Sequence, residues 1–379
     1  MSWFLRLLAD TDKADVLANA CVRTRNGYAD SRVFDVDPES FKAVPGDPFA
    51  YWVTESVRQT FTRLRPFEGE NRVVKQGLAT AEDFRFVRLW WEIHSGLGDT
   101  GWSSFAKGGS FSPFYSDVFL AVNWAEDGRE IKASICQRYP YLNGNPNYVA
   151  KHTDYYHRPG LTWPRRTNGL SVRVLPSGCI FADKGPAAFV AGDDHEDLLA
   201  LSCLLNSRAF GLLVSVQLAR VELAQSFEVG LVQQTPVPTL SAVQRINLAQ
   251  LGRRAWSLKR TLDTTIETSH AFLLPAALRQ RLDDHVPAAL ESELARIQAQ
   301  IDTIAFDLYG FAEADRQLLQ GEAETEATSD VDDQEAEPAD ELPKEDSLLS
   351  WAVGVAFGRF DSCLATGERT APPEPEPFD

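Results

Sequence analysis

The spacing of hydrophobic residues changes along the chain, and each change predicts a different kind of element. Apolar residues of segment 3–20, such as Trp3, Leu7 and Leu17, recur at helical intervals. Helical spacing returns after a Pro-Gly-Asp-Pro start signal at 45–48 and predicts an amphipathic helix over 49–64. We therefore expect a helical lead-in over 1–44, followed by the first helix of a folded domain.

A different texture begins at residue 73 and ends at the Thr-Pro-Val-Pro segment 235–238. Short apolar or aromatic runs are separated there by Gly, Pro, Asn and Asp, which is typical of a β-rich domain with long loops. One helix, 196–218, is expected to interrupt it because leucines form a dense stripe. The predicted strand runs are 84–93, 118–124, 170–175, 179–182 and 229–232.

The last third of the chain is predicted to be helical, with two segments of other character. Pro275 and Pro287 mark breaks between helices over 241–309, and residues 291–308 place apolar side chains three and four apart, as in a packed helix. Residues 321–346 are acidic and poor in aromatics, which predicts a disordered linker. The apolar segment that follows, within 347–379, is expected to dock onto another unit.

These patterns predict a mixed α/β protein. A β-rich domain over 45–240 is followed by a helical region over 241–320, the acidic linker and the C-terminal docking segment. The 379 residues are more than one hydrophobic core usually holds, and 44% hydrophobic residues are ample for packed domains.

The charge is unevenly distributed, and this distribution changes what it implies. The net charge is −17, but residues 321–346 hold twelve acidic residues and a single lysine. Together with 347–379 they account for −14, which leaves about −3 on residues 1–320. The folded part is therefore nearly neutral, and the total charge does not exclude nucleic acid as a partner.

The five cysteines are widely separated, which argues against a disulfide scaffold or a zinc ribbon and favours a reducing compartment. No apolar run reaches the roughly 18–20 residues needed to span a bilayer, and the N-terminus lacks the pattern of a secretion signal. We expect a cytoplasmic protein that does not contact a membrane.

Two motifs resemble methyltransferase or nucleotide-binding signatures but lie in an unsuitable context. Residues 96–101 read Gly-Leu-Gly-Asp-Thr-Gly, yet the residues after them cannot form the helix that would bind a pyrophosphate. Asn145-Pro146-Asn147-Tyr148 differs by one residue from the Asn-Pro-Pro-Tyr motif of amino-methyltransferases, but no buried strand precedes it. A glycine loop and a surface turn are the preferred interpretations, so no catalytic or cofactor-binding residue is assigned.

Two groupings contain residue types that bind metal ions in proteins. Asp117, Glu130 and Lys132 have the spacing of metal-dependent nucleases, in which two carboxylates hold Mg²⁺. This grouping supports the alternative function of a nuclease. His152 and His157 lack an obvious third ligand, so a metal site is not predicted there.

A cluster of basic and aromatic residues is the strongest candidate site. Segment 151–173 holds five basic residues and one acidic residue, interleaved with Tyr155, Tyr156 and Trp163. Lys107 and Lys184 each precede glycine in two further turns, 107–109 and 184–185. Arginine can read guanine edges, lysine and backbone amides can bind phosphates, and aromatic rings can stack on bases. A purely structural packing of Arg against Trp is the alternative.

Ten segments occur in a fixed order along the chain: PGDPFAYWV (45–53), KQGLAT (75–80), RFVRLWWE (85–92), KGG (107–109), VNWAEDGREIK (122–132), YHRPGLTW (156–163), FADKGP (181–186), LLNS (204–207), TPVP (235–238) and LLSWAVGVAFGR (348–359). This ordered series is much more specific than any single motif. Over roughly residues 40–360 it resembles the target-recognition half of large adenine-specific DNA methyltransferases of the type IIG and BREX/phage-growth-limitation kind.

This resemblance implies DNA target recognition at residues 45–240 on behalf of an enzyme that methylates adenine N6. The complete family enzyme uses S-adenosylmethionine, which this chain is not expected to bind. The implied partners are double-stranded DNA, an upstream methylase domain or subunit, and other phage-defence proteins. The expected DNA-contacting residues are Trp102, Lys107, Gly108, Gly109, Thr162, Trp163, Arg165, Arg166, Lys184 and Gly185, with the two tryptophans either stacking on bases or bracing loops.

The chain departs from the whole enzyme because it lacks a credible cofactor-binding loop and a credible Asn-Pro-Pro-Tyr motif. We therefore expect it to be non-catalytic on its own, as a fragment or a split subunit. Two alternatives to DNA recognition are the Mg²⁺-dependent nuclease and a non-catalytic scaffold of a phage-defence complex.

Overall fold

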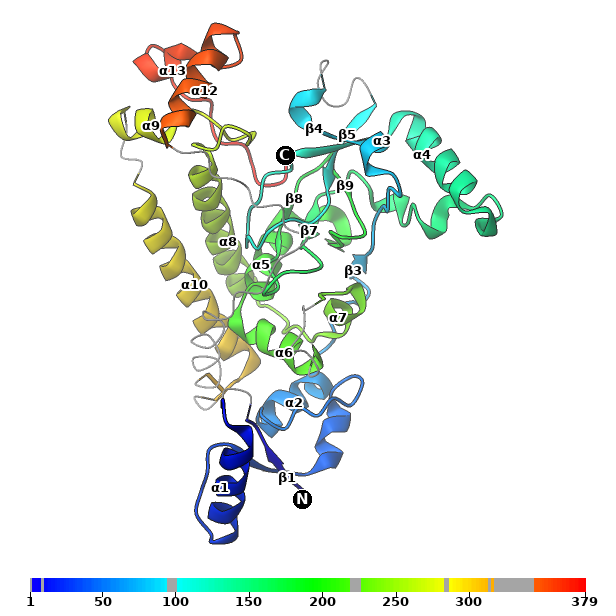
Figure 1. Cartoon of the computed structure of the whole chain (residues 1–379), viewed down its shortest axis with the longest axis vertical. Helices are drawn as coiled ribbons and strands as arrows, with labels where there is room; N and C mark the ends of the chain where they lie inside the picture. Colours follow the sequence, from blue (N-terminus) through cyan, green and yellow to red (C-terminus); the bar gives the residue numbers. More distant parts are fainter. Residues whose placement is uncertain are drawn as a thin grey trace.

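The computed structural model describes residues 2–7, 10–93, 101–218, 226–282, 286–312, 315–316 and 344–379. It is a mixed α/β protein with two four-stranded sheets, a two-stranded sheet and a layer of long helices (Figure 1). The acidic segment predicted as a linker lies mostly outside the described residues, and so do residues 96–100 of the glycine-rich motif.

The first four-stranded sheet is antiparallel and buried on both faces. Its order is β3-β10-β7-β8, with β3 at Arg72–Lys75, β10 at Ala187–Val190, β7 at Gly160–Thr162 and β8 at Arg173–Leu175. Side chains alternate across a strand. Accordingly, Ala188 and Val190 enter one hydrophobic core, whereas Ala187 and Phe189 enter another. Because both faces are covered, β10 consists entirely of apolar residues.

The second four-stranded sheet covers one of these faces. Its order is β4-β6-β5-β9, with β4 at Val87–Leu89, β6 at Leu120–Asn123, β5 at Trp102–Ala106 and β9 at Ile180–Phe181. Strands β5 and β9 run parallel, with Phe105 opposite Ile180 and Ala106 opposite Phe181. Both strands therefore end at the same edge of the sheet, which matters for the candidate site.

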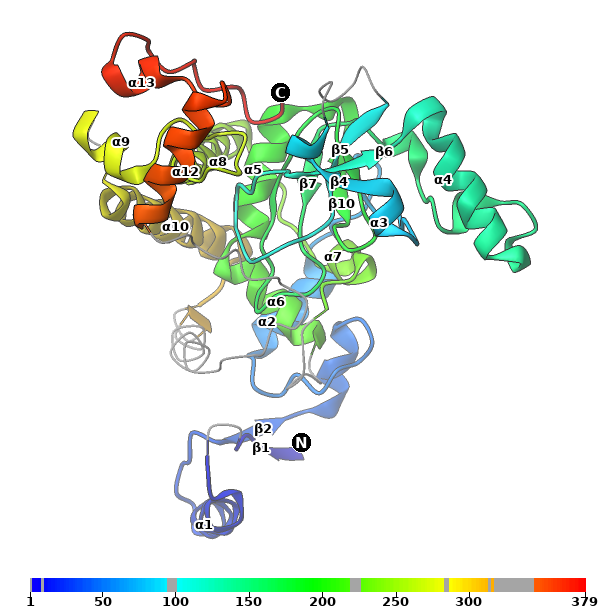
Figure 2. The same cartoon turned by 45° about the horizontal axis from the view of Figure 1, so that its top comes forward.

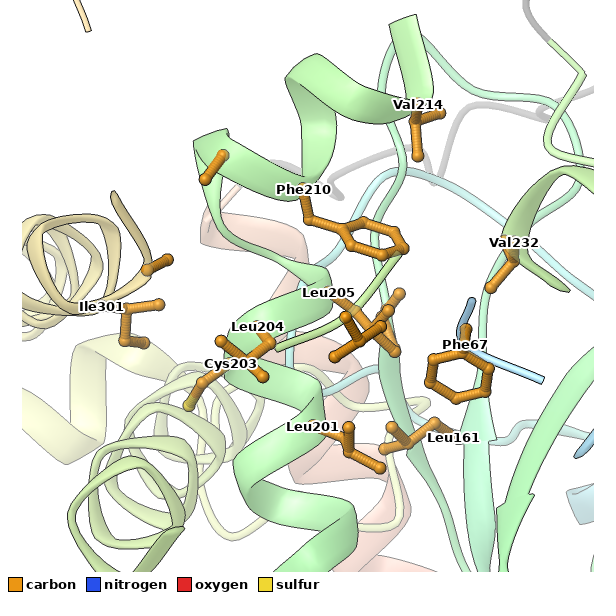
Figure 3. Packing of buried hydrophobic residues seen from close by; sticks show 14 of the residues in the cluster. Phe67, Leu161, Leu201, Cys203, Leu204, Leu205, Phe210, Val214, Val232 and Ile301 are labelled. Carbon is orange, nitrogen blue, oxygen red and sulfur yellow. The ribbon is translucent and has the colours of Figure 1, made fainter. Parts of the chain in front are cut away.

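Helices cover the other face of the first sheet. Helix α5 (His195–Leu205) contacts β7, β8 and β10, and the long helices α8 (Ala242–Asp263) and α10 (Pro287–Tyr309) pack outside it (Figures 1 and 2). Figure 3 shows leucines of α5 between Ile301 of α10 and the residues Leu161 and Phe67 on the sheet side. The predicted breaks are confirmed, because Pro275 directly precedes α9 (Ala276–Leu282) and Pro287 begins α10.

The predicted helix over 196–218 is two helices. The chain bends by 62° between α5 and α6 (Arg208–Leu218), where Asp302 of α10 accepts a hydrogen bond of 2.8 Å from the backbone N–H of Arg208. Among the described residues, no single helix is both long and apolar enough to cross a bilayer, although this bent pair meets the criterion when its two helices are taken together.

Other secondary-structure predictions are wrong in instructive ways. Residues 2–5 form strand β1 (Ser2–Leu5), which pairs with β2 (Val33–Val36), and helix α1 (Lys13–Arg25) starts only where Asp12 caps it. Helix α2 (Glu55–Arg63) likewise starts six residues later than predicted, after the cap residue Thr54. The apolar run 229–232 lies in helix α7 (Val229–Gln234). This helix packs against β3 instead of adding a strand to the sheet.

Short elements fill the connections. Three left-handed residues, Glu126 to Gly128, form a turn at the start of α4 (Ala125–Arg138). Helix α3 (Asp83–Phe86) precedes β4. The 3₁₀ turns are η1 (Pro38–Ala43), η2 (Trp90–Glu92), η3 (Pro140–Leu142), η4 (Pro146–Tyr148), η5 (Thr153–Tyr155) and η6 (Ala191–Asp193).

The C-terminal segment returns to the body of the protein. Helices α12 (Lys344–Ala356) and α13 (Ser362–Thr366) lie beside α9, and Ser350 donates a 2.9 Å hydrogen bond to Glu267 (Figure 2). The last residues reach the sheet, where the Phe378 ring is fully buried and its carbonyl accepts a 2.9 Å hydrogen bond from the N–H of Ser177.

Candidate nucleic-acid interface

Three loops that are far apart in the sequence meet at one edge of the two sheets. They follow β5, β7 and β9, and they comprise residues 107–109, 163–166 and 183–185, which we name the KGG, WPRR and DKG loops. The N–H of Arg165 donates a 3.0 Å hydrogen bond to the carbonyl of Lys184, and the N–H of Ala182 donates one of 2.9 Å to Ala106. All four basic residues predicted to contact DNA, Lys107, Arg165, Arg166 and Lys184, are therefore in these three loops.

Glycine is required where these loops touch. A Cβ on Gly185 would lie 2.8 Å from both the Ala106 carbonyl and the Gly108 nitrogen, and the Ala106 carbonyl cannot move away without losing its hydrogen bond from the N–H of Ala182. Gly108 has a φ of +99°, a region that favours glycine, and its own Cβ position lies 2.9 Å from the carbonyl oxygen of Lys184. The Lys-Gly turns seen in the sequence thus allow the KGG and DKG loops to pack closely.

The four cations differ in exposure and partners. Arg166 and Lys184 are exposed, and Arg166 forms a backbone bridge to Ser226. Arg165 is partly buried, with its Nε 3.6 Å from Glu228. Lys107 is paired with Asp83 at the start of α3. Partial burial of Asp83 opposes its ionisation, but hydrogen bonds from Lys107 and Thr80 outweigh this effect and lower the pKa of the carboxyl group. Asp83 and Glu228 thus orient cations of the site, a role that the sequence did not reveal.

Thr162 and Trp163 support the loops from inside. Both are buried: the Thr162 hydroxyl donates to the carbonyl of Pro186 at 2.9 Å, and the Trp163 indole N–H donates to the carbonyl of Phe227 at 2.9 Å. Of the two roles considered for Trp163, bracing the loop fits this position and stacking on a base does not. Trp102 lies at the far end of β5, about 16 Å from Lys107 at the usual rise per residue of a strand, so it is not part of the cluster.

The nuclease alternative does not have the geometry it needs. Glu130 accepts a 2.8 Å hydrogen bond from Arg85, Lys132 donates one of 2.6 Å to Asp127, and Asp117 lies 3.1 Å from the His270 ring nitrogen. The three residues thus have separate partners. In the ranges that the structure describes, no group of three His, Cys, Asp or Glu side chains is arranged to hold a metal ion.

Asp117 instead belongs to a partly buried acidic cluster at the end of α8. Burial, together with the negative charge of Asp117, raises the pKa of Asp263 to about 6. In the unfolded chain an aspartate has a pKa of about 3.9. Between these two values the folded protein binds more protons than the unfolded chain, so the contribution of Asp263 to stability is present below about pH 4 and is lost as the pH rises to 6.

Asp263→Asn is therefore expected to raise the free energy of unfolding at pH 7 by about 2 kcal/mol. The gain should shrink as the pH falls from 6 to 4, because the wild-type carboxyl group then becomes protonated. Urea denaturation of the wild type and the variant across this range would measure it. Equal stabilities at pH 7 would contradict the raised pKa.

Comparison with known proteins shows which proteins this chain resembles. No protein-family model matches it. It is 24% identical over 361 residues to the adenine-specific methyltransferase PglX of Lacticaseibacillus casei (strain Zhang), a match that covers 86% of this chain and 28% of the relative. It is 25% identical over 287 residues to the adenine-specific methyltransferase BrxX of Escherichia coli O9:H4 (strain HS), covering 72% of this chain and 22% of the relative.

The chain thus spans about a quarter of the length of the curated relatives that it matches. Among solved structures, the type IIL restriction-modification enzyme MmeI in complex with DNA matches 70% of this chain and 37% of its own, with a TM-score of 0.39 and 12% identity. The two curated relatives confirm the resemblance found in the sequence. The homologues of this chain are adenine-specific methyltransferases, PglX and BrxX, and the similarity extends over most of its length.

Proposed function

We propose that this chain recognises double-stranded DNA for an adenine-specific (N6) methyltransferase of a restriction-modification or BREX-type phage-defence system. The convergence of Lys107, Arg165, Arg166 and Lys184 at one edge carries this proposal. Cations and glycine-rich backbone within reach of each other can bind phosphates, while an exposed arginine can read a guanine edge. The similarity to two adenine-specific methyltransferases supplies the reaction that such recognition would serve.

The methylase activity is assigned to another domain or subunit, because the residues present do not fit S-adenosylmethionine or a flipped base. Gly101 leads directly into strand β5 rather than into a helix. The Asn145 side chain accepts a 3.0 Å hydrogen bond from the N–H of Asn147 within its own turn, and Tyr148 is 68% exposed. A base-binding motif needs these groups turned into a pocket. No step of methyl transfer is assigned to this chain.

The N-terminal part is the proposed contact with the methylase. Trp3 of β1, Val22 of α1, Tyr28 and Phe49 are all exposed there, and only Ala20 of α1 is buried. A contiguous exposed apolar patch marks an interaction surface, and we propose that these side chains form one. This part projects from the rest of the molecule, away from the three loops (Figure 1), so both partners could bind together.

DNA binding is expected to depend on the loop cations. Fluorescence anisotropy with a labelled duplex should show an affinity for the full chain that falls steeply with salt. Combining Lys107→Ala, Arg165→Ala and Arg166→Ala should weaken binding about 100-fold at fixed salt and reduce the slope of log K against log salt by about 2–3.

The matched control removes three exposed arginines elsewhere: Arg129, Arg296 and Arg369, whose side chains are more than half exposed. It changes the net charge equally and should keep affinity within about threefold of the wild type. A loop variant that binds as well as this control would refute the site. Absence of wild-type binding at low salt would refute DNA recognition by this chain.

A further inference from the structure

Arg173 is a buried cation at the base of the KGG loop. It lies on β8 with 4% of its surface exposed, and burial lowers its pKa to about 10, so it remains charged at neutral pH. No carboxylate in the described part of the chain forms an ion pair with it. Burying a charge without a counter-charge lowers the stability of the fold unless hydrogen bonds compensate for the lost hydration.

The guanidinium holds two backbone carbonyls of the loop. Nη1 donates to the carbonyl of Ser110 at 3.3 Å, and Nη2 donates to the carbonyl of Gly108. In a trans peptide unit the N–H points opposite to the carbonyl, and this chain has no cis peptide in its described residues. The N–H groups of Gly109 and Phe111 are therefore directed away from Arg173.

These two N–H groups are available to a ligand. Residues 109–111 are exposed, and neither N–H donates a hydrogen bond within the part of the chain that the structure describes. Lys107 lies at one end of the loop, and Gly108 packs against the Lys184 carbonyl of the DKG loop. Two neighbouring N–H donors beside several cations match the oxygens of a phosphate group better than they match any neutral ligand.

We propose that Arg173 is a positioning residue that shapes residues 107–111 into a backbone phosphate-binding loop. This proposal rests on the proposed function, so the ligand of the loop is a phosphodiester of the DNA backbone. The N–H groups of Gly109 and Phe111 hold it, with the Lys107 ammonium group nearby. Arg173 itself stays beneath the loop and does not touch the phosphate. Such a contact fixes the position of the DNA and carries no base preference.

The salt dependence of binding separates this role from direct contact. Arg173→Lys keeps the charge but cannot hold both carbonyls in the same fork. It should weaken duplex binding about 5- to 20-fold with an unchanged salt slope, because neutral N–H groups release no counterions, whereas Lys107→Ala should lower the slope by about 0.9. Arg58→Lys is the matched control. Arg58 lies on α2, is also buried, and donates to the carbonyls of Ala50 and Val53 in the turn that precedes this helix. This control should leave affinity within about twofold of the wild type.

A second measurement does not depend on DNA binding. With selective ¹⁵N-glycine and ¹⁵N-phenylalanine labelling of the full chain, millimolar inorganic phosphate should shift the amide resonances of Gly109 and Phe111 in the wild type and in Arg58→Lys, but not in Arg173→Lys. If phosphate shifts these resonances while the wild type fails to bind duplex DNA, the phosphate-binding loop is supported and the proposed DNA recognition is wrong. If neither DNA nor phosphate shifts them, or if Arg173→Lys binds DNA like Arg58→Lys, the proposed loop is wrong.

Discussion

Replacing Trp163 with alanine is expected to lower the free energy of unfolding by about 3–5 kcal/mol. Trp163 is among the largest fully buried side chains and belongs to the core between the first sheet and the helices. The change would also leave the Phe227 carbonyl, which accepts the indole N–H at 2.9 Å, without its donor. Urea denaturation followed by fluorescence or circular dichroism would measure the loss.

Trp163→Phe separates bracing from base stacking. It keeps an aromatic ring in the core and removes the hydrogen bond, so it should cost about 1–3 kcal/mol. If Trp163 only braces the loop of Arg165 and Arg166, this variant should bind duplex DNA within a fewfold of the wild type under native conditions. Normal stability combined with a large loss of DNA affinity would mean that the ring contacts the nucleic acid, which its burial argues against.

The convergence of the loops illustrates what could be predicted from the sequence. Lys107 and Lys184 each precede glycine in the sequence, and the contacts of Gly108 and Gly185 give the physical reason for that pattern. The parallel pairing of β5 with β9, which brings the two turns together, joins residues about 75 positions apart. Local spacing carries no information on such a pairing, so in the sequence only composition and resemblance point to the cluster.

Burial is where pattern reasoning failed. Arg173 alternates with Val172 and Val174, and alternation ordinarily predicts an exposed polar side chain on a half-buried strand. The first sheet is covered on both faces, so the second face is interior as well and Arg173 is buried. For the same reason Thr162 and Trp163 are structural residues inside the site. The run 229–232 is predicted as a strand but lies in a helix, because a short apolar run fits a buried helix as well as a strand.

Phe378→Ala is expected to cost about 3–5 kcal/mol, as much as the loss of a central core residue. The Phe378 ring is 1% exposed and lies 4.7 Å from the His195 ring at the start of α5, between centroids. The preceding residues add polar contacts to α8: Ser257 donates to Glu374 at 2.8 Å, and Arg253 pairs with Glu376. These pairs are exposed and contribute little by themselves, so the aromatic ring should provide most of the attachment.

Phe357→Ala is the control, because Phe357 follows α12 and is 87% exposed, and it should change stability by less than about 0.5 kcal/mol. Hydrogen exchange of the Ser177 N–H, which donates to the Phe378 carbonyl, should become faster in Phe378→Ala and stay unchanged in Phe357→Ala, since release of the ring also removes this acceptor. The loss of stability should thus extend to the turn at Ser177, which leads directly into β9 and the DKG loop. Equal stability of the two variants would mean that the C-terminal segment does not contribute to the core that positions the candidate interface.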